Sequence, residues 1–275
     1  MSEQPRVAAV QMATGPNVNA NLIEVERLIR DAAQLGAGLV VLPENFAFMG
    51  RRDQDQLALA EDDGDGQLQA FLSKMAARFG VWLVGGTIPV KSETAGRVRA
   101  ASLVFNERGV RVARYDKMHL FDVTLPGADE RYHESATIEP GDDIVVIDSP
   151  FGRLGVLVCY DLRFPEMSRR MLDSGLELLA VPSCFTALTG KAHWETLVRA
   201  RAIENLAYVI AAAQGGYHLN ARETHGHSMI VDPWGAVLAQ VPRGSGTICC
   251  PLDRGFQESV RRTFPTLQHR RLKCR

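Results

Sequence analysis

The chain has 275 residues, enough for one domain with a sizeable core, and 46% of them are hydrophobic, as in ordinary globular enzymes. Its 31 basic and 32 acidic side chains leave a formal net charge of −1. Such a balance provides no overall field that would attract nucleic acid or a membrane surface.

The first third of the chain alternates apolar runs with helical stretches. Leu22, Val25, Leu28 and Ile29 recur at helical spacing, which predicts a helix over 21–35 with one apolar face. The other candidates here are strands at 7–11, 39–42 and 81–84 and a helix at 68–79. This β-α-β-α order is typical of a sheet covered by helices.

A hairpin changes the pattern in the middle of the chain. Strand candidates at 101–105 and 110–115 are joined by the turn-like residues 106–109, which indicates a mixed rather than a purely parallel sheet. After an irregular stretch at 116–143, further strands are predicted at 144–147, 154–158, 178–181, 208–213, 228–231, 237–239 and 247–250, and helices at 165–174 and 193–205.

These elements predict an α/β fold in a single domain spanning residues 1–275, because no linker, repeat or low-complexity tract divides the chain. About a dozen short strands and roughly five helices suit two packed sheets with helices outside both. The pattern alone equally allows one large sheet.

The cysteine content bears on the cellular compartment. The chain has five cysteines, an odd number, and contains no CxxC pair, which argues against a disulfide framework and a zinc knuckle. The N-terminal sequence MSEQPRVAAVQMA lacks the order of basic and apolar residues found in signal peptides. We therefore expect a cytoplasmic protein whose thiols are free for chemistry.

Three reactive side chains each follow a predicted strand. Glu44 comes after the strand at 39–42, Lys117 after the hairpin, and Cys159 after the strand at 154–158. Residues at strand ends of α/β sheets converge on the crevice where ligands bind. A carboxylate, an amine and a thiol in equivalent positions form a chemically coherent group.

The residue types suggest a nucleophilic mechanism. At a strand-to-helix turn Cys159 can expose its sulfur, and nearby backbone N–H groups would lower the thiol pKa. Glu44 can accept the thiol proton, while Lys117 and the backbone N–H of Tyr160 can stabilise an oxyanion. A thioester would form and then be hydrolysed. The alternative is structural: a buried Cys159, a solvated Glu44 and a surface Lys117.

The segments around these three residues resemble the nitrilase, or carbon–nitrogen hydrolase, superfamily. The matching motifs are LVVLPENF around Glu44, YDKMHLFD around Lys117 and GVLVCYDLRFPE around Cys159. Further similarity lies in YHESATIEPGD, TGKAHWETLVRARAIEN and GHSMIVDPWGAVLA. The resemblance extends from Val7 to about Arg271.

This resemblance implies a four-layer α-β-β-α sandwich that pairs into a homodimer or a higher homo-oligomer. It implies Glu44 as general base, Lys117 as the acid that stabilises the oxyanion, and Cys159 as nucleophile. It also points to Glu134 as a second carboxylate that orients Lys117 or the substrate. No metal or organic cofactor, nucleic acid or membrane is implied.

Among the branches of the superfamily, CYDLRFPEMS, ARAIENLAYVIAAAQGG and FPTLQHRR look closest to amidases that act on deaminated glutathione. Those enzymes split 2-oxoglutaryl-Cys-Gly into 2-oxoglutarate and Cys-Gly, a metabolite-repair reaction. The alternatives are an ω-amidase acting on 2-oxoglutaramate or 2-oxosuccinamate, or an N-carbamoyl amidohydrolase. From another class, a catalytically silent binding or scaffold protein is the alternative.

An anionic acyl group calls for a cation in the pocket. Arg163, four residues after Cys159, is the first candidate, because a guanidinium binds a carboxylate through two hydrogen bonds. The resemblance places Phe185 and Thr189 against the acyl chain. A salt bridge from Arg163 to Glu166 and a core position for Phe185 are the alternatives. Segments 47–56 and 215–226 are candidates for the leaving-group side.

Overall fold

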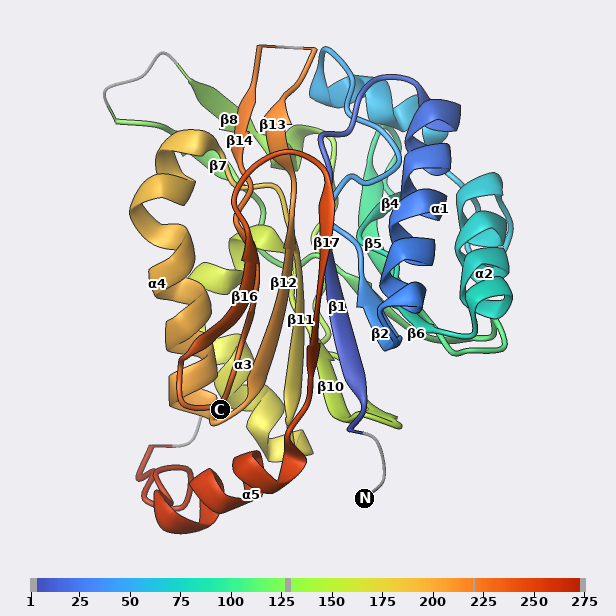
Figure 1. Ribbon diagram of the computed structural model, residues 1–275. Coiled ribbons are helices and arrows are strands. Elements are labelled where there is room, and N and C mark those ends of the chain that lie inside the picture. Colours follow the sequence, from blue (N-terminus) through green and yellow to red (C-terminus); the bar gives the residue numbers. More distant parts are fainter. Residues whose placement is uncertain (1–3, 127–129, 220, 273–275) are drawn as a thin grey trace.

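The computed structural model describes residues 4–126, 130–219 and 221–272 (Figure 1). Its α-helices are α1 Val18–Gln34, α2 Gln67–Phe79, α3 Pro165–Met171, α4 Ala187–Asn205 and α5 Arg254–Thr263. Short 3₁₀ turns lie at Asp53–Leu59, Glu134–Ala136, Cys159–Arg163 and Leu172–Ser174. Among these described residues no helix has the length and apolar character needed to cross a membrane.

The first sheet is mixed and has seven strands in the order β17-β1-β2-β3-β5-β4, with β6 paired to β5. Its strands are β1 Arg6–Gln11, β2 Ala37–Val41, β3 Trp82–Val84, β4 Ile88–Lys91, β5 Val98–Phe105, β6 Arg111–Asp116 and β17 Gly246–Pro251. β1 lies parallel to β2 and antiparallel to β17, in a register that runs from Arg6 opposite Pro251 to Gln11 opposite Gly246.

The second sheet has six strands in the order β16-β15-β12-β11-β10-β9. They are β9 Val146–Ser149, β10 Gly152–Val156, β11 Leu178–Ser183, β12 Tyr208–Ala213, β15 Ser228–Val231 and β16 Val237–Val241. Two short ribbons stand apart from the sheets, and they are β7 Asp122–Thr124 with β8 Arg131–His133, and β13 Gly215–Tyr217 with β14 Glu223–His225.

The two sheets pack face to face between helices, and β1 shows how the sequence produces this. Because side chains alternate along a strand, Val7 and Ala9 enter the core between the sheets, whereas Ala8 and Val10 enter the core beneath α1 and α2. On the other side, Trp194 of α4 joins the inter-sheet core cluster from the outer face of the second sheet. The four-layer α-β-β-α sandwich is thereby confirmed, and one large sheet is excluded (Figure 1).

Several boundaries differ from the sequence-based expectation because side-chain caps extend or add helices. Thr186 accepts a hydrogen bond from the backbone N–H of Thr189, so α4 begins at Ala187 rather than near residue 193. Asp253 caps α5 in the same way, and this amphipathic helix was not predicted. The stretch 116–143, expected to be irregular, contains the β7–β8 ribbon.

Candidate active site

The ends of strands from both sheets meet at one pocket. Glu44 follows β2 and Lys117 follows β6 in the first sheet, while Cys159 follows β10 in the second. All three side chains line a pocket whose empty volume, including its open mouth, is about 670 Å³. The other lining residues are Asn45, Asp53, Gln56, Ala100, Phe121, Tyr132, Glu134, Thr137, Ile138, Tyr160, Arg163, Cys184, Phe185, Thr189 and Arg222.

Glu44 is fixed by contacts to its backbone. Its carbonyl accepts a hydrogen bond of 2.9 Å from Gln214, a residue that directly follows β12 of the opposite sheet. The next residue, Asn45, has a φ of 57° and donates its N–H to Thr87 at 2.9 Å. The chain thus leaves β2 in a sharp turn that directs the Glu44 carboxylate into the pocket.

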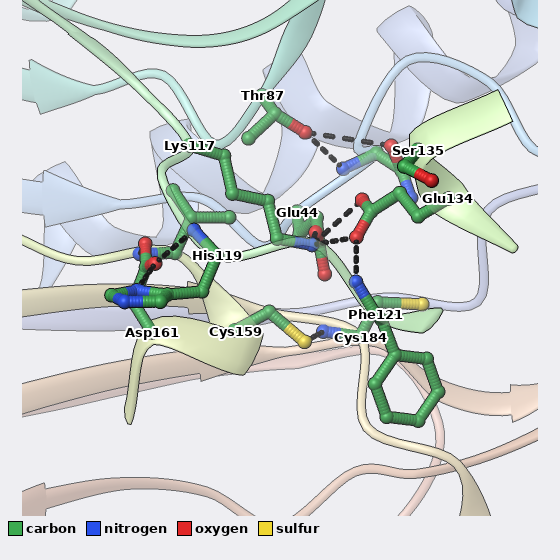
Figure 2. Close-up of polar contacts among 12 residues, drawn as sticks. Glu44, Thr87, Lys117, His119, Phe121, Glu134, Ser135, Cys159, Asp161 and Cys184 are labelled. Atoms are coloured by element: carbon green, nitrogen blue, oxygen red, sulfur yellow. Dashed lines mark hydrogen bonds and ion pairs between the residues drawn. The ribbon is translucent and has the colours of Figure 1, made fainter. Parts of the chain in front are cut away.

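Lys117 lies between two carboxylates (Figure 2). Its Nζ donates to Glu44 Oε1 at 2.8 Å and to both oxygens of Glu134, at 2.7 and 2.8 Å. The side chains of Lys117 and Glu44 are only 2% and 5% exposed, and that of Glu134 is 21% exposed. The backbone N–H of Phe121 donates to Glu134 Oε2 at 2.7 Å and fixes the second carboxylate.

This arrangement keeps the amine charged. Burial acts against the Lys117 charge, but the carboxylates of Glu134 and Glu44 outweigh it and hold the pKa of Lys117 well above its ordinary value. Burial also raises the pKa of Glu134, an effect that Lys117 opposes and Glu44 reinforces. The site therefore contains a fixed cation beside two carboxylates that compete for it.

Cys159 occupies a strained turn. It has a φ of 50°, a left-handed conformation that is uncommon for a residue with a side chain. The backbone N–H of Cys184 donates to Cys159 Sγ at 3.4 Å. The prediction of an exposed thiol with a lowered pKa is wrong. Cys159 is 8% exposed, and burial together with the Glu44 charge raises its pKa well above the ordinary value. The thiol therefore needs a base to become nucleophilic.

A buried carboxylate anchors this turn. Asp161 Oδ2 accepts hydrogen bonds from the N–H of Val158 at 3.0 Å and from the hydroxyl of Tyr115 at 2.5 Å. Its Oδ1 accepts from the N–H of His119 at 2.9 Å and lies 2.8 Å from the ring Nδ1 of the same residue. Asp161 thus ties the turn that carries Cys159 to the segment around β6.

The predicted substrate-binding residues also reach the pocket. The Arg163 guanidinium lies 4.8 Å from the centre of the Phe185 ring and 5.8 Å from that of Tyr160, and its Nη1 lies 3.1 Å from His193 Nδ1. Within the described chain no carboxylate lies within 4.0 Å of it, so the alternative salt bridge to Glu166 is not formed. Phe185 belongs to the core and also lines the pocket, so its contact with the acyl chain stays a prediction.

Thr189 has a second role besides lining the pocket. Its hydroxyl lies 2.9 Å from the hydroxyl of Thr186, the residue that caps α4. The first turn of α4 therefore forms part of the pocket wall.

Sequence reasoning missed several residues that the fold brings here. Cys184 was not expected beside the nucleophile, and Tyr132 comes from the ribbon in the stretch read as irregular. Asp53, Gln56 and Arg222 were not singled out, although they fall in the two segments, 47–56 and 215–226, proposed for the leaving-group side. Three-residue strands and polar loops carry too little hydrophobic pattern to locate such side chains.

Comparison with known proteins identifies the family. The family model named carbon-nitrogen hydrolase matches residues 6–262. The chain is 42% identical to a deaminated glutathione amidase from Yersinia enterocolitica over 96% of this chain and 92% of that protein. It is 40% identical to the deaminated glutathione amidase of Homo sapiens over 98% of this chain and 83% of that protein.

The solved structures agree with this assignment. The fold is similar to that of Saccharomyces cerevisiae Nit3, a member of branch 10 of the nitrilase superfamily, with a TM-score of 0.87 and 32% identity. That similarity covers 99% of this chain and 98% of Nit3. The protein therefore belongs to the carbon-nitrogen hydrolase family.

Proposed function

We propose that this carbon-nitrogen hydrolase is an amidase that converts deaminated glutathione into 2-oxoglutarate and Cys-Gly, a metabolite-repair reaction. One observation carries the proposal. A buried lysine held by two carboxylates shares a pocket with a cysteine and with Arg163, an arginine that forms no salt bridge with a carboxylate of the described chain. The first three groups supply amide hydrolysis, and the arginine supplies an anchor for an anionic acyl group. Relatives of that name, at about 40% identity over nearly the whole chain, support the choice of substrate.

The first half of the reaction makes a thioester. Glu44 takes the thiol proton of Cys159, and the sulfur adds to the scissile carbonyl carbon. The oxyanion is stabilised by Lys117 and by backbone N–H groups, for which Cys184 and Tyr160 are the candidates. As the carbon–nitrogen bond breaks, the leaving nitrogen takes the proton from Glu44, and Cys-Gly departs as an amine.

The second half restores the enzyme. Glu44 takes a proton from water, whose oxygen adds to the thioester carbon, and the carbon–sulfur bond breaks. The sulfur regains a proton and 2-oxoglutarate is released. Among the described residues no hydrogen bond joins Glu44 to Cys159, so we place the first proton transfer in the complex with substrate, where catalytic contacts tighten. Glu134 holds Lys117 in place throughout.

The acyl group is bound on the Arg163 side of the pocket. Burial lowers the pKa of Arg163, yet a guanidinium stays charged at neutral pH. Its Nη1 contacts His193 and its plane lies over Phe185, so the other N–H groups of the guanidinium would bind the 2-oxo acid. Tyr160 and Thr189 also line the pocket. We place the enzyme in the cytoplasm, because the four cysteines in the described part of the chain are free and the mechanism requires a reduced thiol.

Steady-state kinetics tests the proposal. Purified enzyme is assayed with deaminated glutathione beside 2-oxoglutaramate, and we expect kcat/KM to favour the former at least ten-fold. Mass spectrometry after rapid acid quench should show a 2-oxoglutaryl adduct on the wild type and none on Cys159→Ala. A preference for 2-oxoglutaramate would make the protein an ω-amidase, and turnover by Cys159→Ala would remove the proposed nucleophile.

A further inference from the structure

We infer that Arg222 binds the carboxylate of the leaving group, so that this amidase selects amides whose released amine is itself an anionic peptide. The inference rests on the proposed function and deepens it, since Cys-Gly carries a carboxylate and ammonia does not. The catalytic triad of Glu44, Lys117 and Cys159 acts on the amide bond and does not distinguish these two leaving groups. Arg222 can distinguish them, because its guanidinium lies where the carboxylate of Cys-Gly would be.

Arg222 stands where the pocket continues outward. A second depression, lined by the segment 48–52 among others, shares Asn45, Asp53, Gln56 and Arg222 with the pocket that contains the triad. Arg163 lines only the first of these two spaces. The two guanidinium groups are therefore distributed between the acyl side of the pocket and the side where the pocket adjoins the second depression.

The Arg222 guanidinium is held in place by the protein. Its Nη2 donates to the carbonyl of Cys184 at 3.0 Å, and its central carbon lies 5.0 Å from the centre of the Tyr132 ring. Burial acts against its charge, but the nearby thiol of Cys184, the Tyr132 hydroxyl and Glu44 together raise its pKa. A fixed guanidinium loses little entropy when it binds a carboxylate.

The distances suit a dipeptide leaving group. Cys184 donates its N–H to Cys159 Sγ at 3.4 Å and accepts from Arg222 Nη2 at 3.0 Å, so one residue separates the nucleophile from the guanidinium. Standard backbone dimensions then place Nη2 within about 10 Å of Sγ. An extended Cys-Gly carries its carboxylate about 7 Å from the scissile carbonyl. The carboxylate can thus reach the guanidinium while Cys159 attacks.

The other charged residues that line the second depression do not oppose this assignment. Asp53 is exposed, and water screens an exposed carboxylate. Arg52 lines only the outer depression and is already paired with Asp55 at 3.1 Å. Among the described residues, Arg222 is therefore the arginine that lines both the catalytic pocket and the second depression.

The experiment compares three substrates and three variants. The substrates are deaminated glutathione, its analogue ending in glycinamide instead of glycine, and 2-oxoglutaramate. For Arg222→Gln we expect kcat/KM with deaminated glutathione to fall roughly ten- to one-hundred-fold, as for loss of a charged hydrogen bond, and that with the other two substrates to change less than about three-fold. Arg163→Gln should impair all three substrates, and Arg52→Gln none of them.

Two outcomes would overturn the inference. An equal loss on all three substrates would mean that Arg222 only positions Cys184. A selective loss in Arg52→Gln instead of Arg222→Gln would place the carboxylate farther out. Thermal melts and circular dichroism of each variant establish that it is folded.

Failure of the proposed function has a different signature. If the wild type hydrolyses 2-oxoglutaramate but not deaminated glutathione, Cys-Gly and cysteinyl-glycinamide are tested as inhibitors of that reaction. Inhibition by Cys-Gly that weakens at least ten-fold in Arg222→Gln would retain the carboxylate site. The carboxylate site would be excluded if Cys-Gly did not inhibit at millimolar concentration, or if it inhibited the wild type and Arg222→Gln equally.

Discussion

At the scale of single residues, the resting site keeps its nucleophile protonated. Burial and the Glu44 carboxylate both raise the pKa of Cys159, whereas Lys117 and the N–H of Cys184 act in the opposite direction with less effect. A raised thiol pKa means that the thiolate fraction is small at neutral pH and grows as the pH rises. We therefore expect iodoacetamide to alkylate Cys159 more slowly than free cysteine at pH 8, with a rate that still rises above pH 9.

Glu44→Gln should separate reactivity from catalysis. Removing a negative neighbour lowers the pKa of Cys159, so alkylation at pH 8 should become several-fold faster, while the loss of the base should reduce kcat at least a thousand-fold. The measurements are alkylation followed by mass spectrometry and turnover of deaminated glutathione. Slower alkylation in this variant would contradict the electrostatic account, and near-normal turnover would contradict the role of Glu44 as base.

At the scale of elements, the turn after β10 depends on Asp161. Asparagine has one acceptor oxygen in place of two, so Asp161→Asn must lose the contacts of one side, either those of Val158 and Tyr115 or those of His119. Lost hydrogen bonds to a buried charge should lower Tm by about 5–10 °C. Because the same contacts position Cys159, kcat should fall at least ten-fold while KM changes less than about three-fold.

Asp232→Ala provides the control, because both hydrogen bonds of Asp232 end on its Oδ1 and asparagine could keep them. Asp232 is buried and accepts hydrogen bonds from the N–H groups of Trp234 and Ala236 in the turn between β15 and β16, outside the pocket. This variant should lose stability without losing kcat. If Asp161→Asn behaved in the same way, Asp161 would stabilise the fold without positioning the nucleophile.

The elements also show how far the sequence can predict this protein. The strand ends that carry Glu44, Lys117 and Cys159 were predictable, because buried strands have continuous apolar runs. The sequence left the burial of Cys159 open, because an exposed and a buried cysteine were both considered, and the packing of the two sheets decides for the buried one. For Arg222 the sequence indicated only the segment 215–226, and the residue itself could not be singled out because neither strand of the β13–β14 ribbon has more than three residues.

At the scale of the whole molecule, an apolar patch suggests self-association. Trp234 and Phe264 are 57% and 48% exposed, and their rings contact each other with centroids 5.4 Å apart. Ile203, which is 46% exposed, lies against the neighbouring Gly235. Such side chains are unfavourable in water unless a partner covers them. We propose that a second copy of the chain does so and forms a homodimer.

Light scattering after size-exclusion chromatography tests the homodimer. The 30.2 kDa chain should elute at twice its mass, and Trp234→Glu should shift it toward the monomer, because a buried unpaired charge disfavours an interface. Ile23→Glu on α1 is the control, since Ile23 is 72% exposed on the other outer layer. A monomeric wild type would contradict the dimer, and an equal effect of both substitutions would place the interface elsewhere.

The pairing of β1 with β17 has a consequence for how the protein is made. Residues 6–11 are synthesised first among the described strands, yet their antiparallel partners at 246–251 are synthesised last among them. At about 5–20 residues per second, β1 waits roughly 10–50 seconds for that neighbour. During this time one edge of an apolar strand is open to wrong partners. The first sheet can therefore close along this side of β1 only after β17 has been synthesised, and the open edge must be kept from wrong partners until then.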